Sequence, residues 1–219
     1  MFNKSAIIFD LDGTLIDTEE LILASFRKGS EEVLGQAIPD EHVRQLIGIP
    51  LIEQANRLAP QHAEELMKAY RQYNIELHDK LIHYFEGTRE MLEELKREGR
   101  RLSVVTSKRN EPAMEGLSSF NLQGYFEFVS GLEDTEKHKP DPEPLLVAAS
   151  RMGVPVKECV YVGDSVYDMQ AACAAGMTSI AALWGMYPRE QLLEAGAQYV
   201  AASPVELPAL IRKIEEDGK

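Results

Sequence analysis

A short apolar run lies at 6–10, and further short apolar runs alternate with amphipathic segments through most of the chain after residue 87. The apolar runs have the length of buried strands, and the amphipathic segments repeat apolar residues at helical spacing. The predicted strands are 6–10, 101–107, 127–131, 159–164 and 178–183, and the predicted helices are 87–99, 110–119, 142–152, 166–175 and about 204–215. Because strands that alternate with helices usually pair in parallel, the pattern predicts an α/β fold, a parallel sheet flanked by helices.

The segment 17–80 has a different pattern, with helix after helix and no convincing strand. Apolar residues recur at helical spacing in 17–34, two short helices are expected in 40–58, and a further helix runs from about 60 to 78. An all-helical insert after the first strand suggests a cap over the sheet. We therefore predict a core domain formed by 1–16 and 82–219 and a helical cap domain at 17–81.

Charge narrows the possible functions. The 219 residues carry a formal net charge of −13. This charge argues against general nucleic-acid binding and against attraction to an anionic membrane surface. If the substrate is an anion, the site itself must supply positive charge or a metal ion.

Cysteine usage and the start of the chain bear on the compartment. Cys159 and Cys173 form no CxxC pair, so a disulfide framework is not expected and a reducing compartment is the simple interpretation. The first apolar run is too brief for a signal peptide or a membrane span. We expect a cytoplasmic monomer or homodimer that binds neither nucleic acid nor membrane.

Polar residues stand at the ends of three predicted strands. Asp10 ends the first, Thr106 and Ser107 end the second, and Asp164 ends that at 159–164. In open parallel sheets ligands bind beyond the carboxyl ends of the strands, so these side chains are expected to share one crevice. Asp12 lies two residues after Asp10, and two such carboxylates repel each other unless a cation such as a metal ion offsets the repulsion.

Four short motifs that carry polar or charged residues follow one another along the chain: DLDGT (10–14), TS (106–107), KPDP (139–142) and GDSVYD (163–168). Each has an ordinary explanation alone, since DxD is often a turn and GDSxxD can be a helix N-cap. Together they resemble the four motifs of the haloacid dehalogenase superfamily, in its branch with a helical cap. The resemblance implies a Rossmann-like core with an inserted α-helical cap.

The resemblance also implies catalytic roles. Asp10 is expected to be the nucleophile that attacks phosphorus and becomes an aspartyl-phosphate. Asp12 is expected to be the general acid and base. Thr106 and Ser107 would bind the phosphoryl group, and Lys139 would place positive charge on it.

A Mg²⁺ ion is the expected cofactor. The resemblance implies that Asp10, the backbone carbonyl of Asp12 and Asp164 bind the metal, which suits the preference of Mg²⁺ for a few oxygen ligands and several waters. Asp168 would support the site from behind the ligands or hold Lys139.

Several reactions are possible within this superfamily. Dehalogenases lack an acid at the position of Asp12, so Asp12 favours phosphoryl transfer. Sugar phosphomutases usually carry a cap histidine where this chain has Ile22, which argues against a mutase. Phosphonate hydrolases need a cap lysine, and the nearest candidate, Lys28, has polar neighbours typical of an exposed segment.

A phosphatase of small phosphate monoesters is therefore expected, with inorganic pyrophosphatase as the alternative. The segment 44–51 (RQLIGIPL) resembles phosphoglycolate phosphatases and would place Gly48 of the cap near the substrate. The segments 15–26 and 139–146 resemble bacterial pyrophosphatases of the same family. The partner is thus expected to be a small phosphorylated metabolite or pyrophosphate.

Two non-enzymatic alternatives remain. A phospho-acceptor receiver domain also uses a strand-end Asp, Mg²⁺ and a lysine, but it lacks a helical cap and an acid equivalent to Asp12. A catalytically silent binding protein on the same fold would not need an intact motif set. Both alternatives are therefore less favoured than a phosphatase.

Overall fold

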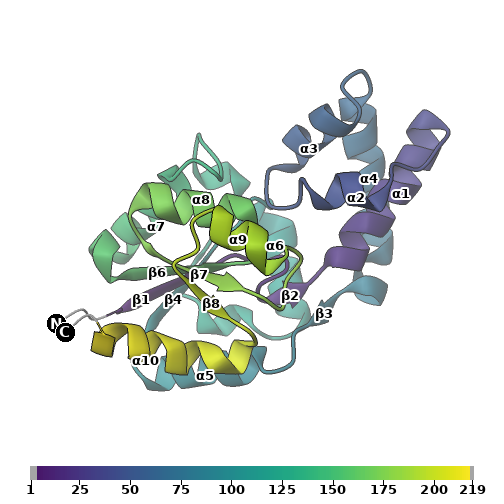
Figure 1. Cartoon of the computed structure of the whole chain (residues 1–219). Helices are drawn as coiled ribbons and strands as arrows, with labels where there is room; N and C mark the ends of the chain where they lie inside the picture. Colours follow the sequence, from purple (N-terminus) through teal and green to yellow (C-terminus); the bar gives the residue numbers. More distant parts are fainter. Residues whose placement is uncertain (1–3, 218–219) are drawn as a thin grey trace.

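The computed structural model describes residues 4–217. Its central sheet has six parallel strands in the order β5-β4-β1-β6-β7-β8 (Figure 1). The strands are β1 (Ala6–Phe9), β4 (Arg101–Val105), β5 (Val129–Ser130), β6 (Cys159–Gly163), β7 (Thr178–Ala182) and β8 (Tyr199–Ala201). The predicted parallel α/β architecture is confirmed.

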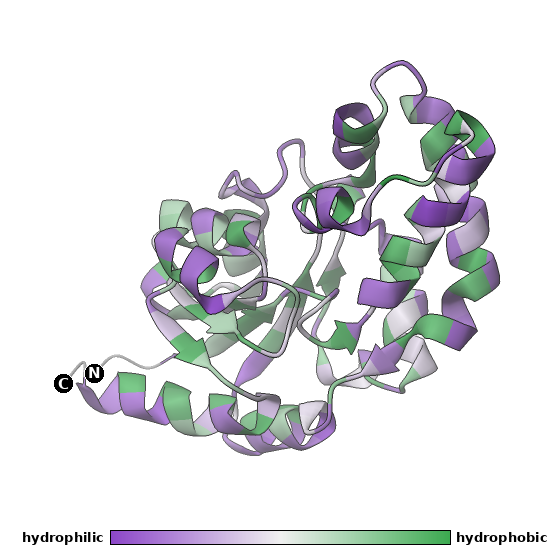
Figure 2. Ribbon diagram, turned by 45° about the vertical axis from the view of Figure 1, so that its right-hand side comes forward, coloured by the Kyte–Doolittle hydropathy of each residue, from purple (hydrophilic) through white to green (hydrophobic). Residues whose placement is uncertain are grey.

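Helices cover both faces of this sheet because alternate strand residues point to opposite sides. Ile7 and Phe9 of β1 pack with apolar residues of α5 (Thr88–Arg97), α6 (Asn110–Ser119) and α10 (Leu207–Asp217). Ala6 and Ile8 pack on the other face with α7 (Glu143–Met152) and α8 (Val166–Ala175). Figure 2 shows the helices striped in purple and green, as expected for elements that bury one face.

The helical insert has a core of its own. It consists of α1 (Glu19–Leu34), α2 (Asp40–Arg44), α3 (Leu51–Leu58) and α4 (Ala63–Leu81). Phe26 of α1 and Tyr70 of α4 lie in a buried cluster of this insert, with ring centroids 4.5 Å apart. These helices stand to one side of the sheet in Figure 1, and we refer to them below as the cap.

The two connections between cap and sheet run side by side. β2 (Ile16–Asp17) pairs antiparallel with β3 (His83–Tyr84), so the chain leaves and re-enters the α/β part at one place. The predicted boundaries at 16/17 and 81/82 fall at this ribbon. That the cap is an independent domain stays a prediction.

Some elements differ from those predicted. The strand expected at 127–131 is limited to Val129–Ser130, and the last helix begins at Leu207. No sequence pattern predicted β2, β3, β8 or α9 (Arg189–Glu194), which have two to six residues each. Segments so short show no measurable periodicity and depend on tertiary pairing. Four 3-10 turns, at Gln123–Tyr125, Leu132–Asp134, Val156–Glu158 and Pro204–Glu206, complete the described elements.

No helix within residues 4–217 combines the length and apolar character that a membrane crossing requires.

We predict that Phe26→Ala destabilises the cap by about 3–4 kcal/mol, because it removes a fully buried ring. Hydrogen exchange should lose protection within 17–81 and keep it in β6. Ile75→Ala, which alters a side chain that is 76% exposed on α4, is the matched control. An equal loss of protection in β6 would show that the cap and the sheet unfold as one unit.

Candidate active site

The central strands bring the predicted strand-end residues to one edge of the sheet. β1 lies between β4 and β6, with Phe9 level with Val104 and Val162. Asp10 therefore lies level with the ends of both neighbours, and its backbone N–H donates to Val162 O at 2.9 Å. Thr106 follows β4 and Asp164 follows β6, so both stand beside Asp10 at this edge.

A turn after β1 lets the chain pass very close to Asp164. Gly13 has a φ of 76°, and a Cβ atom there would lie 2.1 Å from Asp164 Oδ2. Thr14 Oγ1 donates to Asp164 Oδ1 at 3.0 Å. Gly13 thus lets the backbone pass close to Asp164, where only glycine fits, and Thr14 binds the Asp164 carboxylate.

Three buried carboxylates form the centre of the site. Oxygen atoms of Asp10, Asp164 and Asp168 lie within 4.8 Å of one another. Lys139, which is 2% exposed, places its Nζ 2.6 Å from Asp168 Oδ1 and 3.0 Å from Asp10 Oδ1. One ammonium group cannot neutralise three ionised carboxylates, so the cluster has a deficit of positive charge.

Asp168 has its hydrogen-bonding capacity filled by protein groups. Its Oδ1 receives Lys139 Nζ at 2.6 Å and lies 3.1 Å from the Tyr161 hydroxyl. Its Oδ2 accepts from Ser165 N at 3.0 Å and from Ser165 Oγ at 2.6 Å, within a capping box at the start of α8. Asp168 therefore holds Lys139 and the N-terminus of α8 rather than a metal ion.

The other two carboxylates keep capacity for a cation. Asp164 accepts one bond on each oxygen, from Thr14 Oγ1 and from Met186 N at 2.9 Å. Asp10 Oδ1 is buried and accepts no hydrogen bond of good geometry from any residue between 4 and 217, although Lys139 lies at ion-pair distance. Two such oxygen donors beside uncompensated negative charge fit a hard divalent cation such as Mg²⁺.

The pKa values follow from burial and crowding. Burial, with a further contribution from Asp168, raises the pKa of Asp10 to about 7 against the opposing effect of Lys139. Burial and the charges of Asp168 and Asp10 raise the pKa of Asp164 well above its usual value. Burial by itself lowers the pKa of Lys139, but Asp10 and Asp168 outweigh it and raise the pKa. The lysine is thus charged at neutral pH, and a bound cation would help Asp10 to ionise.

Asp12 has a cationic partner that no motif in the sequence predicted. Lys108 Nζ lies 2.7 Å from Asp12 Oδ1, and Thr18 Oγ1 donates to the same oxygen at 2.7 Å. Lys108 N also donates to Thr106 Oγ1 at 3.2 Å, which folds the chain back toward the site. The only signal in the sequence was that Lys108 lies two residues after the strand-end threonine.

Gly48 of the cap, which is predicted to lie near the substrate, lies beside core residues of the site. Ser107 Oγ donates to Gly48 O at 2.6 Å. A Cβ atom on Gly48, whose φ is 113°, would lie 2.7 Å from Ser165 Oγ. By contrast, Lys28 is exposed with its Nζ over the Tyr73 ring, and Ile22 is buried in the cap core.

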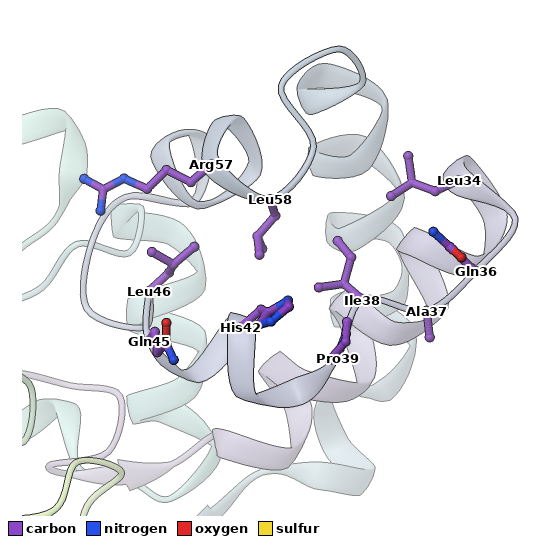
Figure 3. A pocket seen from close by; sticks show the side chains of 10 residues that line it. All are labelled: Leu34, Gln36, Ala37, Ile38, Pro39, His42, Gln45, Leu46, Arg57 and Leu58. Carbon is purple, nitrogen blue, oxygen red and sulfur yellow. The ribbon is translucent and has the colours of Figure 1, made fainter.

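A separate cavity of about 390 Å³ lies within the cap, lined by ten residues between Leu34 and Leu58 (Figure 3). None of the predicted catalytic or metal-binding residues lines it. The carboxylate cluster, not this cavity, is therefore the candidate active site.

Comparison with known proteins assigns the family. The model of haloacid dehalogenase-like hydrolases matches residues 7–182. The chain belongs to this family.

Relatives and solved structures agree with that assignment. One relative comes from Caldanaerobacter subterraneus and is provisionally named a pyrophosphatase PpaX. It is 42% identical to this chain over 213 residues, which cover 97% of both chains. The pyrophosphatase PpaX of Halalkalibacterium halodurans is 34% identical over 203 residues, 93% of this chain and 94% of the relative. A solved hydrolase from Pseudomonas syringae is similar with a TM-score of 0.86 and 28% identity, over 96% of this chain and 99% of the other.

A predicted phosphoglycolate phosphatase from Haemophilus somnus has a TM-score of 0.87 over 94% of this chain and 97% of the other. Its identity of 22% supports the shared fold alone. The expected family, fold class and phosphatase class of this haloacid dehalogenase-like hydrolase are thus confirmed. The individual roles of its site residues stay predictions.

We predict that the metal-free protein loses stability as pH rises. A pKa raised from 3.8 to about 7 means that the folded state holds the Asp10 proton more tightly than the unfolded chain. The resulting penalty grows from about pH 4 to pH 7. At pH 8, Asp10→Asn should therefore raise the free energy of unfolding by up to about 4 kcal/mol, roughly 10 °C in the unfolding midpoint.

Mg²⁺ should raise the unfolding midpoint of the unmodified protein and have far less effect on Asp10→Asn, as calorimetry would show. Asp79→Asn, at a carboxylate that is 94% exposed, is the control and should behave like the unmodified protein. Equal stabilisation of all three proteins by Mg²⁺ would place the metal elsewhere.

Proposed function

We propose that this protein is a Mg²⁺-dependent phosphatase that cleaves inorganic pyrophosphate through an aspartyl-phosphate on Asp10. The pairing of Asp12 with Lys108 at 2.7 Å carries the choice of pyrophosphate. Small phosphate monoesters would undergo the same chemistry and are the second candidate, as the cap segment around Gly48 suggests. The two PpaX names give the pyrophosphate proposal further support.

The proposed first step is an attack by Asp10 on phosphorus. One Asp10 oxygen forms a bond to phosphorus while the bond to the leaving oxygen breaks. Lys139, 3.0 Å from Asp10 Oδ1, helps to keep the carboxylate ionised and offsets negative charge on the phosphoryl group. When bound by Asp10, Asp164 and the Asp12 carbonyl, Mg²⁺ would supply Lewis-acid stabilisation of that charge.

In this proposal Asp12 is the general acid and the general base. It donates a proton to the leaving oxygen, and it then takes one from the water that attacks the aspartyl-phosphate. Thr18 orients the carboxyl through its hydrogen bond to Asp12 Oδ1. The hydroxyl of Thr106 and the backbone amide of Ser107 would hold phosphoryl oxygens at the end of β4.

The leaving group explains the choice of substrate. Asp12 must lie next to the leaving oxygen to protonate it, so Lys108 must lie there too. In pyrophosphate the leaving group is itself a phosphate, whose charge a second ammonium group would stabilise. A neutral alcohol leaving group would gain little from such a cation, and glycolate, with its single carboxylate charge, would gain less than the more highly charged phosphate.

Compartment and assembly remain proposals as well. Both cysteines are free thiols in the structure, which agrees with the proposed cytoplasmic location. A monomer or homodimer is still the expected state.

Phosphate release from pyrophosphate, phosphoglycolate and an aryl phosphate tests the proposal. We expect Mg²⁺-dependent turnover that stops with a chelator, with pyrophosphate preferred by about tenfold or more, roughly 1.4 kcal/mol in the transition state. Asp10→Asn should abolish turnover of all three. Measurable turnover by this variant, shown by mass spectrometry to retain Asn, would exclude Asp10 as the nucleophile.

Lys108→Ala separates the two substrate classes. Removing the cation should lower kcat/KM for pyrophosphate by about 30-fold or more, about 2 kcal/mol, and lower it much less for the aryl phosphate. Lys137→Ala, at an exposed lysine that pairs with Asp141, is the matched control. An equal loss on both substrates would contradict a role for Lys108 in binding the leaving phosphate.

A further inference from the structure

Three side chains of the α/β core donate hydrogen bonds to the backbone of one cap loop, residues 45–49. Ser107 Oγ donates to Gly48 O at 2.6 Å, Tyr167 Oη to Gln45 O at 2.9 Å, and Tyr187 Oη to Ile47 O at 3.1 Å. The donors come from three separate segments that follow β4, β6 and β7. The loop is thus held from several sides at the mouth of the site.

Both tyrosines belong to segments that also fix the carboxylates. Tyr167 lies in α8 beside Asp168, whose carboxylate forms the capping box with Ser165. Tyr187 directly follows Met186, whose N–H donates to Asp164 Oδ2 at 2.9 Å. The positions of the two hydroxyls are therefore set by the same short segments that set Asp164 and Asp168.

The loop packs with the cap. Ile47, only 4% exposed, packs in the buried cluster of the cap. Gln45 and Leu46 line the cavity in the cap, so this part of the loop is backed by open space rather than by packed side chains (Figure 3). Hydrogen bonds from the core are consequently important for holding the loop in place.

We propose that Tyr167 and Tyr187 are positioning residues that dock loop 45–49 of the cap onto the core and so set the affinity for the substrate. The kinetic part of this inference rests on the proposed phosphatase function. Neither tyrosine needs to touch the reacting atoms. The acceptors are backbone carbonyls, so the docking contact is independent of the loop side chains.

Docking would change the affinity for the substrate by changing the fraction of molecules in which loop 45–49 is docked on the core. If the substrate binds tightly only when the loop is docked, its apparent affinity falls in proportion to the docked fraction. The chemistry occurs on Asp10 and Asp12 in the core, so a saturating substrate can restore the docked state. Loss of the tyrosine hydroxyls should therefore raise KM and leave kcat nearly unchanged.

The test uses Tyr167→Phe, Tyr187→Phe and the double variant, each of which keeps the ring and removes the hydroxyl. In the double variant we expect KM for pyrophosphate to rise about tenfold with kcat within about twofold. Hydrogen exchange of the amides in 45–49, measured without substrate, should become faster. Circular dichroism and the unfolding midpoint verify that each variant is folded.

Tyr73→Phe is the matched control. Its hydroxyl donates to Glu32 at 2.8 Å within the cap, so its removal should change neither KM nor exchange in 45–49. The proposal requires both a higher KM and faster exchange in the double variant. A change in only one of them, or in neither, would overturn it.

Failure of this inference can be distinguished from failure of the proposed function. The proposed function fails if the unmodified protein releases no phosphate from pyrophosphate or the other phosphate substrates. The docking inference fails if the unmodified protein is active and the double tyrosine variant matches it in KM, in exchange or in both.

Discussion

The site depends on one buried lysine set among three buried carboxylates. Lys139 lies within 3.0 Å of both Asp10 and Asp168, with Asp164 completing the cluster. Burying these charges is costly unless each is paired or neutralised. Asp168 is satisfied by four protein groups, so the unbalanced charge falls on Asp10 and Asp164. This imbalance explains why the raised carboxyl pKa values and the fit to a divalent cation concern the same two residues.

The fold makes this arrangement possible by placing strand ends together. β1 is central, and its neighbours β4 and β6 deliver Thr106 and Asp164 to its carboxyl end. Gly13 allows the turn after Asp10 to approach Asp164, and the cap enters directly after that turn. The cap then returns over the site through the loop around Gly48, which the core holds by side-chain hydroxyls. The proposed catalytic groups thus lie on the core, and the cap loop around Gly48 lies beside them.

Much of this could be predicted from sequence, because long apolar runs and periodic helices carry strong local signals. The motifs around Asp10, Lys139 and Asp164 also stand at strand ends or in adjacent loops, where the α/β pattern makes their convergence expected. Elements such as β8 have only three residues and form through edge pairing, so no local signal marks them. Lys108 and the tyrosines act through contacts between residues far apart in sequence, such as Lys108 with Asp12 across 96 positions. A pattern read along one chain cannot reveal such contacts.

The most direct test of the account is to trap phosphate on Asp10. Asp12→Asn should still form the aspartyl-phosphate from an aryl phosphate with a leaving group that needs no proton, but it should hydrolyse the intermediate slowly. Acid quenching after mixing with radiolabelled substrate, followed by peptide mapping, should place hydroxylamine-sensitive label on the peptide that contains Asp10. Label on any other residue, or release of phosphate with no protein-bound label at any time, would contradict the account.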